Sequence, residues 1–202
     1  MFTREKVFDS EILRTKCNDK SIYQNQTFLK NIDLMLGTEY RVSLQGKGKS
    51  QTSVYNKKVF TPDKLPMDFD GADELKLWLT KRVPKALELL SDYNYDRRIT
   101  VYRNWINKKY LNSCIIPHNH GSQKDFFVGV FYINYPKDSG KLFFTKHYDE
   151  TKHHIEDYDD EDVHVVNETE GEFIIHRGDM VHGVTEHLNE DPRLSMIFEF
   201  CI

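Results

Sequence analysis

The chain has 202 residues, enough for one domain with a substantial buried core. It carries 28 lysine and arginine residues against 32 acidic ones, a net charge of −4 that does not favour nucleic acid or an anionic membrane as partner. The three cysteines are far apart and form no CxxC pair, which excludes a disulfide framework and fits a reducing compartment. With no apolar signal segment and no run long enough to span a membrane, the sequence predicts a cytoplasmic protein.

The first half of the chain predicts two helices in a mixed α/β region. Apolar residues recur at roughly helical spacing over residues 21–36 and again over 72–93. Pro84 is expected to kink or split the second helix, because proline lacks the N–H that a helix interior needs. We therefore expect residues 1–97 to form an N-terminal extension whose helix 72–93 packs outside a sheet.

The second half predicts a mainly β core, residues 98–202. Short runs of aromatic and β-branched residues are separated there by Gly, Pro, Asp or Asn, with no helical period between them. The expected strands are residues 99–106, 114–118, 126–134, 141–145, 163–166, 172–176, 180–184 and 194–201. Such a series is typical of an antiparallel sandwich or barrel.

The first candidate site is the pair His118 and His120 in the segment His-Asn-His. Residues i and i+2 of a strand point to the same face, so two imidazoles would converge on one point. Imidazole is a good ligand for iron, zinc, copper and nickel. An HxH pair also occurs on protein surfaces, so this pair alone does not establish a metal site.

A third histidine, His182, follows a predicted strand and a tight turn at Gly178-Asp179. That turn returns the chain beside itself. A histidine in this position could complete a three-ligand face and leave other metal positions open for substrate and oxygen. Non-haem iron oxygenases use such a face, although their usual set is two histidines and one carboxylate.

Arg193 and Ser195 lie 11 and 13 residues after His182 and alternate with an apolar residue, so they share one face of the last strand. A guanidinium fork and a hydroxyl are suited to binding a carboxylate. The alternative is an exposed arginine after the Asp191-Pro192 turn.

These residues resemble the motifs of the iron(II)/2-oxoglutarate-dependent oxygenases, which fold as a double-stranded β-helix. In that superfamily an HxD/E pair and a distal histidine bind the metal, and an Arg or Lys about ten residues later binds the distal carboxylate of 2-oxoglutarate. The stretch Gly129–Asn134 followed by Asp138–Phe144 looks like a strand pair of the prolyl-hydroxylase type, which would give Tyr132 a share in holding that carboxylate. The HxH…H…RxS pattern is most similar to a group of oxygenases found in phages and marine bacteria. The resemblance covers roughly residues 99–202.

The resemblance implies a mainly β protein with flanking helices around a double-stranded β-helix, a jelly-roll and cupin-like core. It implies iron(II) and the co-substrate 2-oxoglutarate as cofactors, with His118, His120 and His182 on the metal and Arg193, Ser195 and Tyr132 on the co-substrate. No catalytic residue beyond the metal ligands is expected. The activity would be a dioxygenase reaction, expected to be hydroxylation of a second substrate. A peptide, an amino acid, a sugar or a nucleotide all remain open as that substrate.

One departure from the superfamily is that His120 stands at the carboxylate position of HxD/E. Asp125 is an alternative third ligand, because HxH-x4-D approximates a cupin metal motif. In that case the protein would be a cupin-type dioxygenase or isomerase without 2-oxoglutarate. A non-enzymatic metal-containing binding module is the other alternative. Of the remaining histidines, His176 is expected to line the pocket, and the others, including His187, are expected to be solvated.

Overall fold

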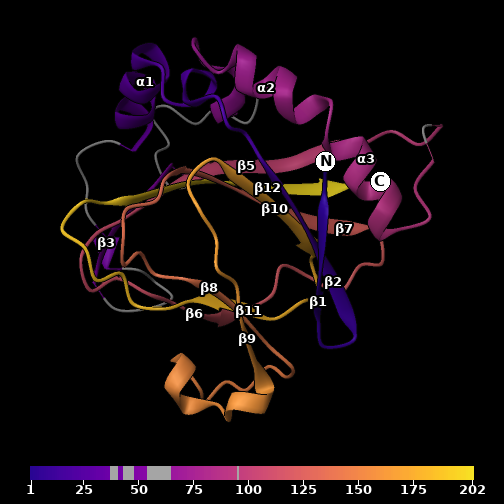
Figure 1. Cartoon of the computed structure of the whole chain (residues 1–202), viewed down its shortest axis with the longest axis vertical. Coiled ribbons are helices and arrows are strands. Elements are labelled where there is room, and N and C mark those ends of the chain that lie inside the picture. The colour runs from indigo at the N-terminus through magenta and orange to yellow at the C-terminus, as the bar shows by residue number, and fades with distance from the viewer. Residues whose placement is uncertain (37–40, 43–47, 54–64, 95) are drawn as a thin grey trace.

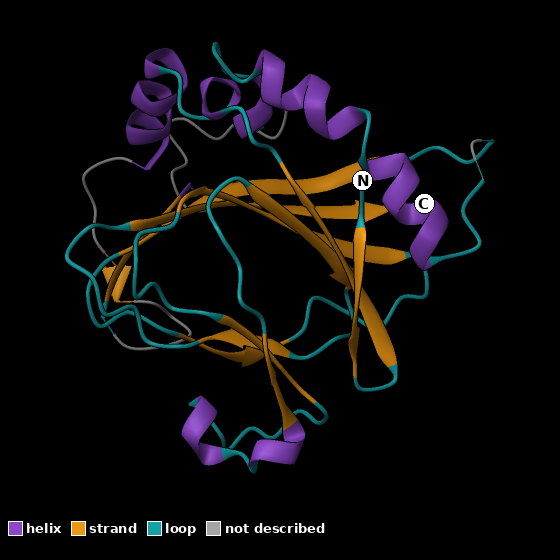
Figure 2. Cartoon of the chain, in the orientation of Figure 1, coloured by secondary structure: helices purple, strands orange, loops and turns teal. Residues whose placement is uncertain are grey.

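The computed structural model describes residues 1–36, 41–42, 48–53, 65–94 and 96–202. Two antiparallel sheets face each other, and helices cover the outer face of the larger one (Figures 1 and 2). The strands are β1 (Thr3–Val7), β2 (Ser10–Lys16), β3 (Arg41–Val42), β4 (Lys49–Thr52), β5 (Thr100–Lys109), β6 (Ile115–His118), β7 (Phe126–Asn134), β8 (Leu142–Thr145), β9 (Val163–Val165), β10 (Glu172–Arg177), β11 (His182–Val184) and β12 (Arg193–Cys201). The larger sheet has the order β1-β2-β10-β7-β12-β5-β4-β3, and the smaller sheet has the order β6-β11-β8-β9.

The strands from β5 to β12 cross repeatedly between the two sheets. The large sheet takes β5, β7, β10 and β12, and the small sheet takes β6, β8, β9 and β11. This winding is that of a double-stranded β-helix, so the predicted fold class is confirmed. Each of the eight strands expected after Arg97 is present, with shifts only at the ends.

The N-terminal region contributes strands that the sequence did not predict. The hairpin β1-β2 joins the large sheet through pairing of β2 with β10. At the other edge, β4 pairs with β5 and β3 pairs with β4. The extension therefore lengthens the sheet of the core at both edges. The expected division into residues 1–97 and residues 98–202, joined in one compact unit, stays a prediction.

Three α-helices pack on the outer face: α1 (Gln26–Leu36), α2 (Asp73–Thr80) and α3 (Val83–Leu90). The side chain of Asn25 accepts a hydrogen bond from the backbone N–H of Phe28 at 2.9 Å, which caps the start of α1. Pro84 lies in the first turn of α3, where a missing N–H costs nothing. The predicted helix 72–93 is thus split at this proline into α2 and α3, as expected.

The large sheet separates two hydrophobic cores, and β12 contributes to both. Leu194, Met196 and Phe198 point outward into the core beneath the helices. Ile197, on the opposite face, points into the core between the sheets. Arg193, Ser195 and Glu199 share the face of Ile197 and are all buried. The inner face of this strand therefore carries polar groups into the interior of the barrel.

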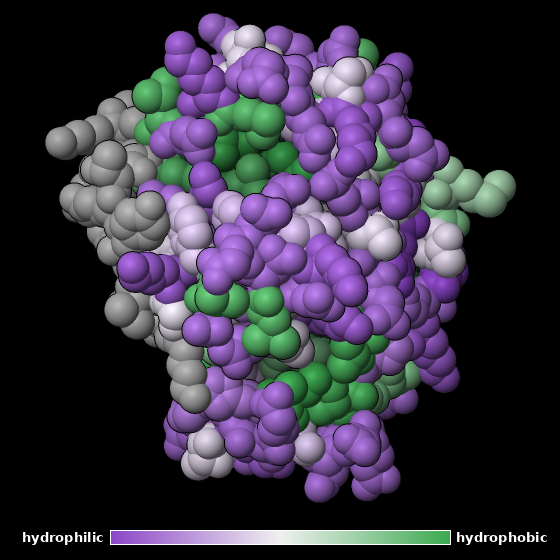
Figure 3. Space-filling model, turned by 60° about the vertical axis from the view of Figure 1, so that its left-hand side comes forward, coloured by the Kyte–Doolittle hydropathy of each residue, from purple (hydrophilic) through white to green (hydrophobic). Residues whose placement is uncertain are grey.

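Most of the face shown in Figure 3 is hydrophilic, and hydrophobic residues gather in two hollowed patches on it. Among the helices that the structure describes, none is both long and apolar enough to cross a membrane.

Candidate metal and co-substrate site

Strand pairing in the small sheet brings His118 and His182 together. The two residues are direct partners in the antiparallel register of β6 and β11. Their ring centroids lie 4.6 Å apart. The predicted convergence of these two histidines, which are 64 positions apart in the sequence, therefore follows from sheet register.

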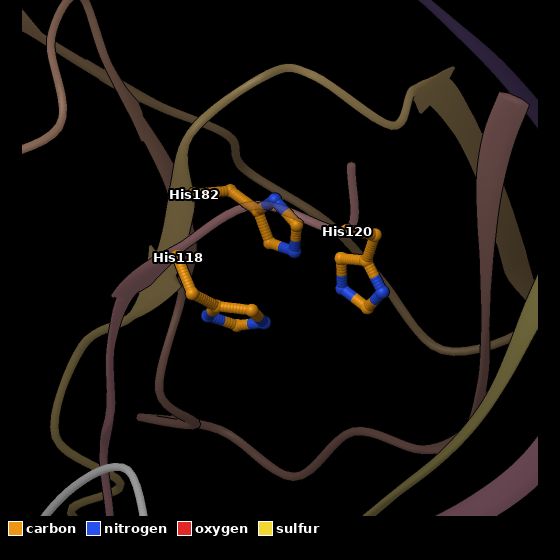
Figure 4. Close-up of side chains that lie close together, drawn as sticks. All are labelled: His118, His120 and His182. Atoms are coloured by element: carbon orange, nitrogen blue, oxygen red, sulfur yellow. The ribbon is translucent and has the colours of Figure 1, made fainter. Parts of the chain in front are cut away.

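His120 lies just beyond the end of β6, and the turn after β10 holds it in place. Its backbone N–H donates to the carbonyl of Gly178 at 2.9 Å. Its ring centroid lies 5.1 Å from that of His118 and 5.2 Å from that of His182. One nitrogen of each of the three rings lies within 4.8 Å of the others, and Figure 4 shows the rings turned toward a common centre. This cluster could hold one metal ion.

The outward nitrogens of the three rings all have acceptors. Nδ1 of His118 lies 3.0 Å from the carbonyl oxygen of Ile116, and Nδ1 of His182 lies 3.0 Å from that of Met180. Nδ1 of His120 lies 2.6 Å from Oε1 of Glu199. Because carbonyl and carboxylate oxygens only accept, each Nδ1 must carry a proton, and in the neutral imidazole Nε2 then carries the lone pair. The hydrogen bonds thus assign the metal-binding tautomer to all three rings.

Burial keeps the imidazoles of His118 and His182 neutral. It lowers the pKa of His118 from the ordinary 6.5 to about 4. Burial also lowers the pKa of His182 well below its ordinary value, and the neighbouring histidines lower it further. Neutral imidazole is the form that binds a metal, so the lone pairs of these two rings are available throughout the physiological pH range.

Asp125, the alternative third ligand, lies outside this cluster. Its carboxylate forms an ion pair with Arg97 at 2.8 Å, and more than a third of its side chain is exposed. Arg97 lowers the pKa of the Asp125 carboxyl by this hydrogen bond. His120, rather than Asp125, is the residue that the structure brings to His118 and His182.

Glu199, which no sequence motif indicated, is a buried carboxylate beside the cluster. It is 1% exposed, and besides His120 it contacts Arg103, whose Nε donates to Oε2 at 2.5 Å. The inward faces of β5 and β12 bring Arg103 and Glu199 opposite each other in register. One signal was available in the sequence: Glu199 is a single acid within the otherwise apolar strand segment Met196–Cys201. A charge in such a strand requires a partner.

A second polar group lies on the same inner face, around Arg193. Arg193 and Ser195 are 3% and 2% exposed, which excludes the alternative of a solvated arginine after a turn. Ser195 and Tyr132 are partners in the register of β12 and β7. The Arg193 guanidinium carbon lies 5.0 Å from the centroid of the Tyr132 ring. The three residues predicted to hold the co-substrate carboxylate are thus assembled in one place.

The donors of this second group are not fully satisfied. Within the described part of the chain, neither the buried Tyr132 hydroxyl nor Nε of Arg193 has a hydrogen-bond partner. Burial raises the pKa of Tyr132 well above its ordinary value, so the hydroxyl remains a donor. Buried donors without acceptors are rare, and they suit a ligand that brings an anionic oxygen.

Two further charged residues near Arg193 were not predicted. Glu168, in the loop after β9, places Oε1 3.9 Å from an Arg193 nitrogen, and burial raises the pKa of Glu168 to about 7. Lys109 is the register partner of Arg193 on β5, and burial lowers the pKa of Lys109 to about 8. Neither stands out in the sequence, because each lies among other charged or polar residues.

Of the predictions for two further histidines, the one for His176 agrees with the structure and the one for His187 does not. His176 is fully buried, with its ring 4.7 Å from that of His182, which agrees with a place in the pocket wall. The expectation that His187 is solvated was wrong, because it is 1% exposed and Nε2 lies 2.8 Å from the carbonyl oxygen of Asp191. It packs beside the turn that precedes β12.

Comparisons with known proteins agree with this architecture. Residues 103–199 match the model of a family described as "Putative 2OG-Fe(II) oxygenase", where 2OG denotes 2-oxoglutarate. The chain is similar to HygX from Streptomyces hygroscopicus, solved with nickel and 2-oxoglutarate bound, with 10% identity and a TM-score of 0.61 over 94% of this chain and 82% of HygX. A prolyl-4-hydroxylase from Pseudomonas putida matches with 14% identity and a TM-score of 0.52 over 94% and 91% of the two chains.

A third similar structure is SnoK, an alpha-ketoglutarate-dependent carbocyclase from nogalamycin biosynthesis, with 11% identity and a TM-score of 0.60 over 94% of this chain and 79% of SnoK. At these identities the structural matches show a common fold and nothing finer. No curated protein matches the sequence.

The fold and the histidine cluster define a cupin-like, double-stranded β-helix protein with a candidate metal site. The family match, which covers residues 103–199 and so slightly less than half of the chain, indicates an iron(II)/2-oxoglutarate-dependent oxygenase, an oxidoreductase. The residues present fit both cofactors of this family. Three Nε2 lone pairs suit a divalent metal ion, and the unsatisfied buried donors around Arg193 suit the carboxylate of 2-oxoglutarate.

Proposed function

We propose that the protein is a hydroxylase that binds iron(II) through His118, His120 and His182. In this proposal 2-oxoglutarate binds between the metal and the group formed by Arg193, Ser195 and Tyr132. The observation that carries it is that one barrel interior holds both a three-histidine cluster and a buried arginine and tyrosine with unsatisfied donors. The first binds a cation and the second binds an anion, as an iron and 2-oxoglutarate pair requires.

Iron(II) together with 2-oxoglutarate supplies the chemistry, in which dioxygen oxidises a C–H bond while 2-oxoglutarate becomes succinate and carbon dioxide. The protein's share is positioning. The Nδ1 hydrogen bonds hold the three imidazoles with Nε2 inward. The Arg193 guanidinium and the Tyr132 hydroxyl donate to the distal carboxylate, and Ser195 adds a neutral hydroxyl from the same strand face. Together, these contacts from Arg193, Tyr132 and Ser195 orient the co-substrate toward the metal.

The cupin-type alternative receives no support from the geometry. It depends on Asp125 as a metal ligand, whereas Asp125 is paired with Arg97 at an exposed position. It also leaves Arg193 with a purely structural role, which does not account for the buried Nε that lacks a described partner.

Hydroxylation rather than another oxidation is the finer part of the proposal. It draws on the likeness of residues Gly129–Phe144 to the prolyl-hydroxylase strand pair and on the similarity to the Pseudomonas putida enzyme. The carbocyclase among the similar structures shows that one fold supports other outcomes. The candidate second substrates are a peptide side chain, a free amino acid, a sugar and a nucleotide. An experiment must distinguish among these four classes.

The test has two stages. Purified protein with iron(II), 2-oxoglutarate and oxygen should form succinate, and His118→Ala should abolish it. Absence of succinate with the wild-type protein under all conditions would contradict the use of 2-oxoglutarate. Metabolite and peptide profiling then identifies the second substrate. A product that gains one oxygen atom supports hydroxylation, whereas an isomer or a product short of two hydrogens would overturn it and leave the oxygenase class intact.

A further inference from the structure

The three histidines differ in what accepts the hydrogen bond from Nδ1. For His118 and His182 the acceptor is a neutral backbone carbonyl at 3.0 Å. For His120 it is the carboxylate of Glu199 at the shorter distance of 2.6 Å. Hydrogen bonds to an ionised acceptor are shorter and about twice as strong as neutral ones. The cluster is therefore asymmetric, and its one charged contact falls on His120.

His120 is also the residue that stands where the resembled superfamily has a carboxylate ligand. A divalent metal on three neutral imidazoles would carry one more positive charge than a metal on two imidazoles and a carboxylate. Glu199 brings one negative charge to the far side of the same ligand. It is held there by β12, a different strand from the one that precedes His120.

We propose that Glu199 is the displaced carboxylate of this centre, a positioning residue that orients His120 and returns the missing negative charge through its imidazole. The proposal rests on the proposed function, since it assumes that the three histidines bind the metal. A carboxylate on the distal nitrogen fixes the tautomer and raises the basicity of the ligand. It also turns the His120 ring so that its other nitrogen faces the common centre (Figure 4).

Arg103 offsets the free-energy cost of burying the Glu199 carboxylate. Glu199 is 1% exposed, and an unpaired carboxylate there would be strongly destabilised. Nε of Arg103 donates to its second oxygen at 2.5 Å, while 57% of the Arg103 side chain remains exposed. The chain Arg103, Glu199, His120 thus runs from the protein surface to the cluster through two hydrogen bonds. Trp105 completes the support, since its ring stacks on that of His120 with centroids 6.0 Å apart.

Three variants separate this role from a purely structural one. Glu199→Gln keeps the size and an acceptor oxygen but removes the charge. Arg103→Gln removes the counter-charge but keeps an amide donor at a largely exposed side chain, and thermal unfolding measures its effect on stability. Glu172→Gln is the matched control, because Glu172 is also a buried carboxylate of the large sheet paired with an arginine, Arg14, at 2.6 Å. It makes no described contact with the three histidines.

The first measurement is cobalt(II) affinity by titration under identical conditions, with thermal unfolding of the metal-free proteins as a check on folding. Glu199→Gln should weaken cobalt binding by about 10- to 100-fold, the range for an outer carboxylate partner of a metal-bound histidine. Arg103→Gln should weaken it less, and Glu172→Gln should leave it at the wild-type value. Equal affinity of Glu199→Gln and wild type would overturn the role of Glu199 alone.

The second measurement uses the metal-free protein and nitrogen-15 NMR of its histidine side chains. The wild type should show His120 as a single tautomer with a strongly hydrogen-bonded Nδ1 proton, and Glu199→Gln should lose or shift that signal. An unchanged His120 signal would overturn the orienting role. Failure of the wild-type protein to bind cobalt(II) would overturn the proposed function, and with it the metal-directed part of this inference.

Discussion

His118 and His182 face each other as direct partners across the β6–β11 ladder, with ring centroids 4.6 Å apart. The histidine cluster is thus built on backbone hydrogen bonds between two strands. The side-chain period of a strand is two, so a shift of one residue in this pairing would turn one histidine away from the other. Sheet register is therefore a requirement for the site as well as for the fold.

Replacing His118, His120 or His182 singly by alanine should reduce metal affinity severely, because each removes one of three protein ligands. Asp125→Ala should leave metal affinity unchanged, since Asp125 contacts Arg97 instead. Isothermal titration with cobalt(II) measures both. A loss in Asp125→Ala equal to that in His120→Ala would reinstate Asp125 as the third ligand.

Arg193→Ala should weaken 2-oxoglutarate binding far more than metal binding. A buried carboxylate that loses its arginine partner loses charge-assisted hydrogen bonds, on the order of 2–5 kcal/mol, which corresponds to a roughly thirtyfold to several-thousandfold drop in affinity. Ser195→Ala should act in the same direction but less, because it removes one neutral hydrogen bond. Anaerobic titration of the iron protein, followed by the metal-to-ligand absorption band, measures the effect. Unchanged 2-oxoglutarate affinity in Arg193→Ala would show that the anchor lies elsewhere.

Glu168→Gln should remove a pH dependence of stability. Burial raises the pKa of Glu168 from 4.5 to about 7, although Arg193 opposes the shift. Between these two pH values the folded protein keeps a proton that the unfolded chain has released, so the free energy of unfolding falls as pH rises. Glu172 faces the same carboxyl and raises its pKa further, whereas the backbone N–H of Leu142 donates to Glu168 and lowers it.

Urea unfolding at several pH values between 5 and 8 tests this directly. The stability of wild type minus that of Glu168→Gln should fall with a slope of up to about 1.4 kcal/mol per pH unit below pH 7 and then level off. A difference that is independent of pH would show that the carboxyl titrates at its ordinary pKa.

Gly183→Ala should destabilise the protein and loosen the metal cluster together. A Cβ at Gly183 would lie 2.6 Å from Cζ of Phe143 and 2.8 Å from the carbonyl oxygen of Ile115. Relief of such contacts in a packed interior typically costs about 1–3 kcal/mol. Because His182 is the preceding residue, the same shift should lower cobalt affinity. Thermal unfolding of Gly183→Ala measures its stability, and titration of the same sample measures its cobalt affinity. If both equal the wild-type values, β11 has room for a side chain at this position.

The strands of the core were predictable because each is a short apolar run bounded by turn residues, and the bounds differ only at the ends. The β1-β2 hairpin was not, because the segment Ser10–Lys16 mixes charged and apolar residues in a way that also suits a loop. Its strand character comes from pairing with β10, a partner more than 150 positions away. A local pattern carries no record of such a partner.

The residues of the candidate site likewise fall into those that the sequence could predict and those that it could not. The histidines and Arg193 could be proposed from spacing, because their chemistry is distinctive at fixed positions of a known pattern. Glu199, Glu168 and Lys109 are common residue types whose importance comes from burial, and burial depends on which strands become neighbours. Lys109 is buried because it lies beside Arg193 on the inner face, whereas the adjacent Lys108 points away and forms an ion pair with Asp33.

The alternation along β12 has an evolutionary consequence. Its outward residues pack against the helices, and its inward residues reach the group around Arg193 at one end and His120 at the other. Substitutions at inward positions can therefore alter chemistry while the packing under the helices is kept. A single inserted or deleted codon within the strand would move every residue on one side of it to the opposite face. Divergence in this segment should accordingly proceed by replacement alone, with length changes confined to the loops on either side.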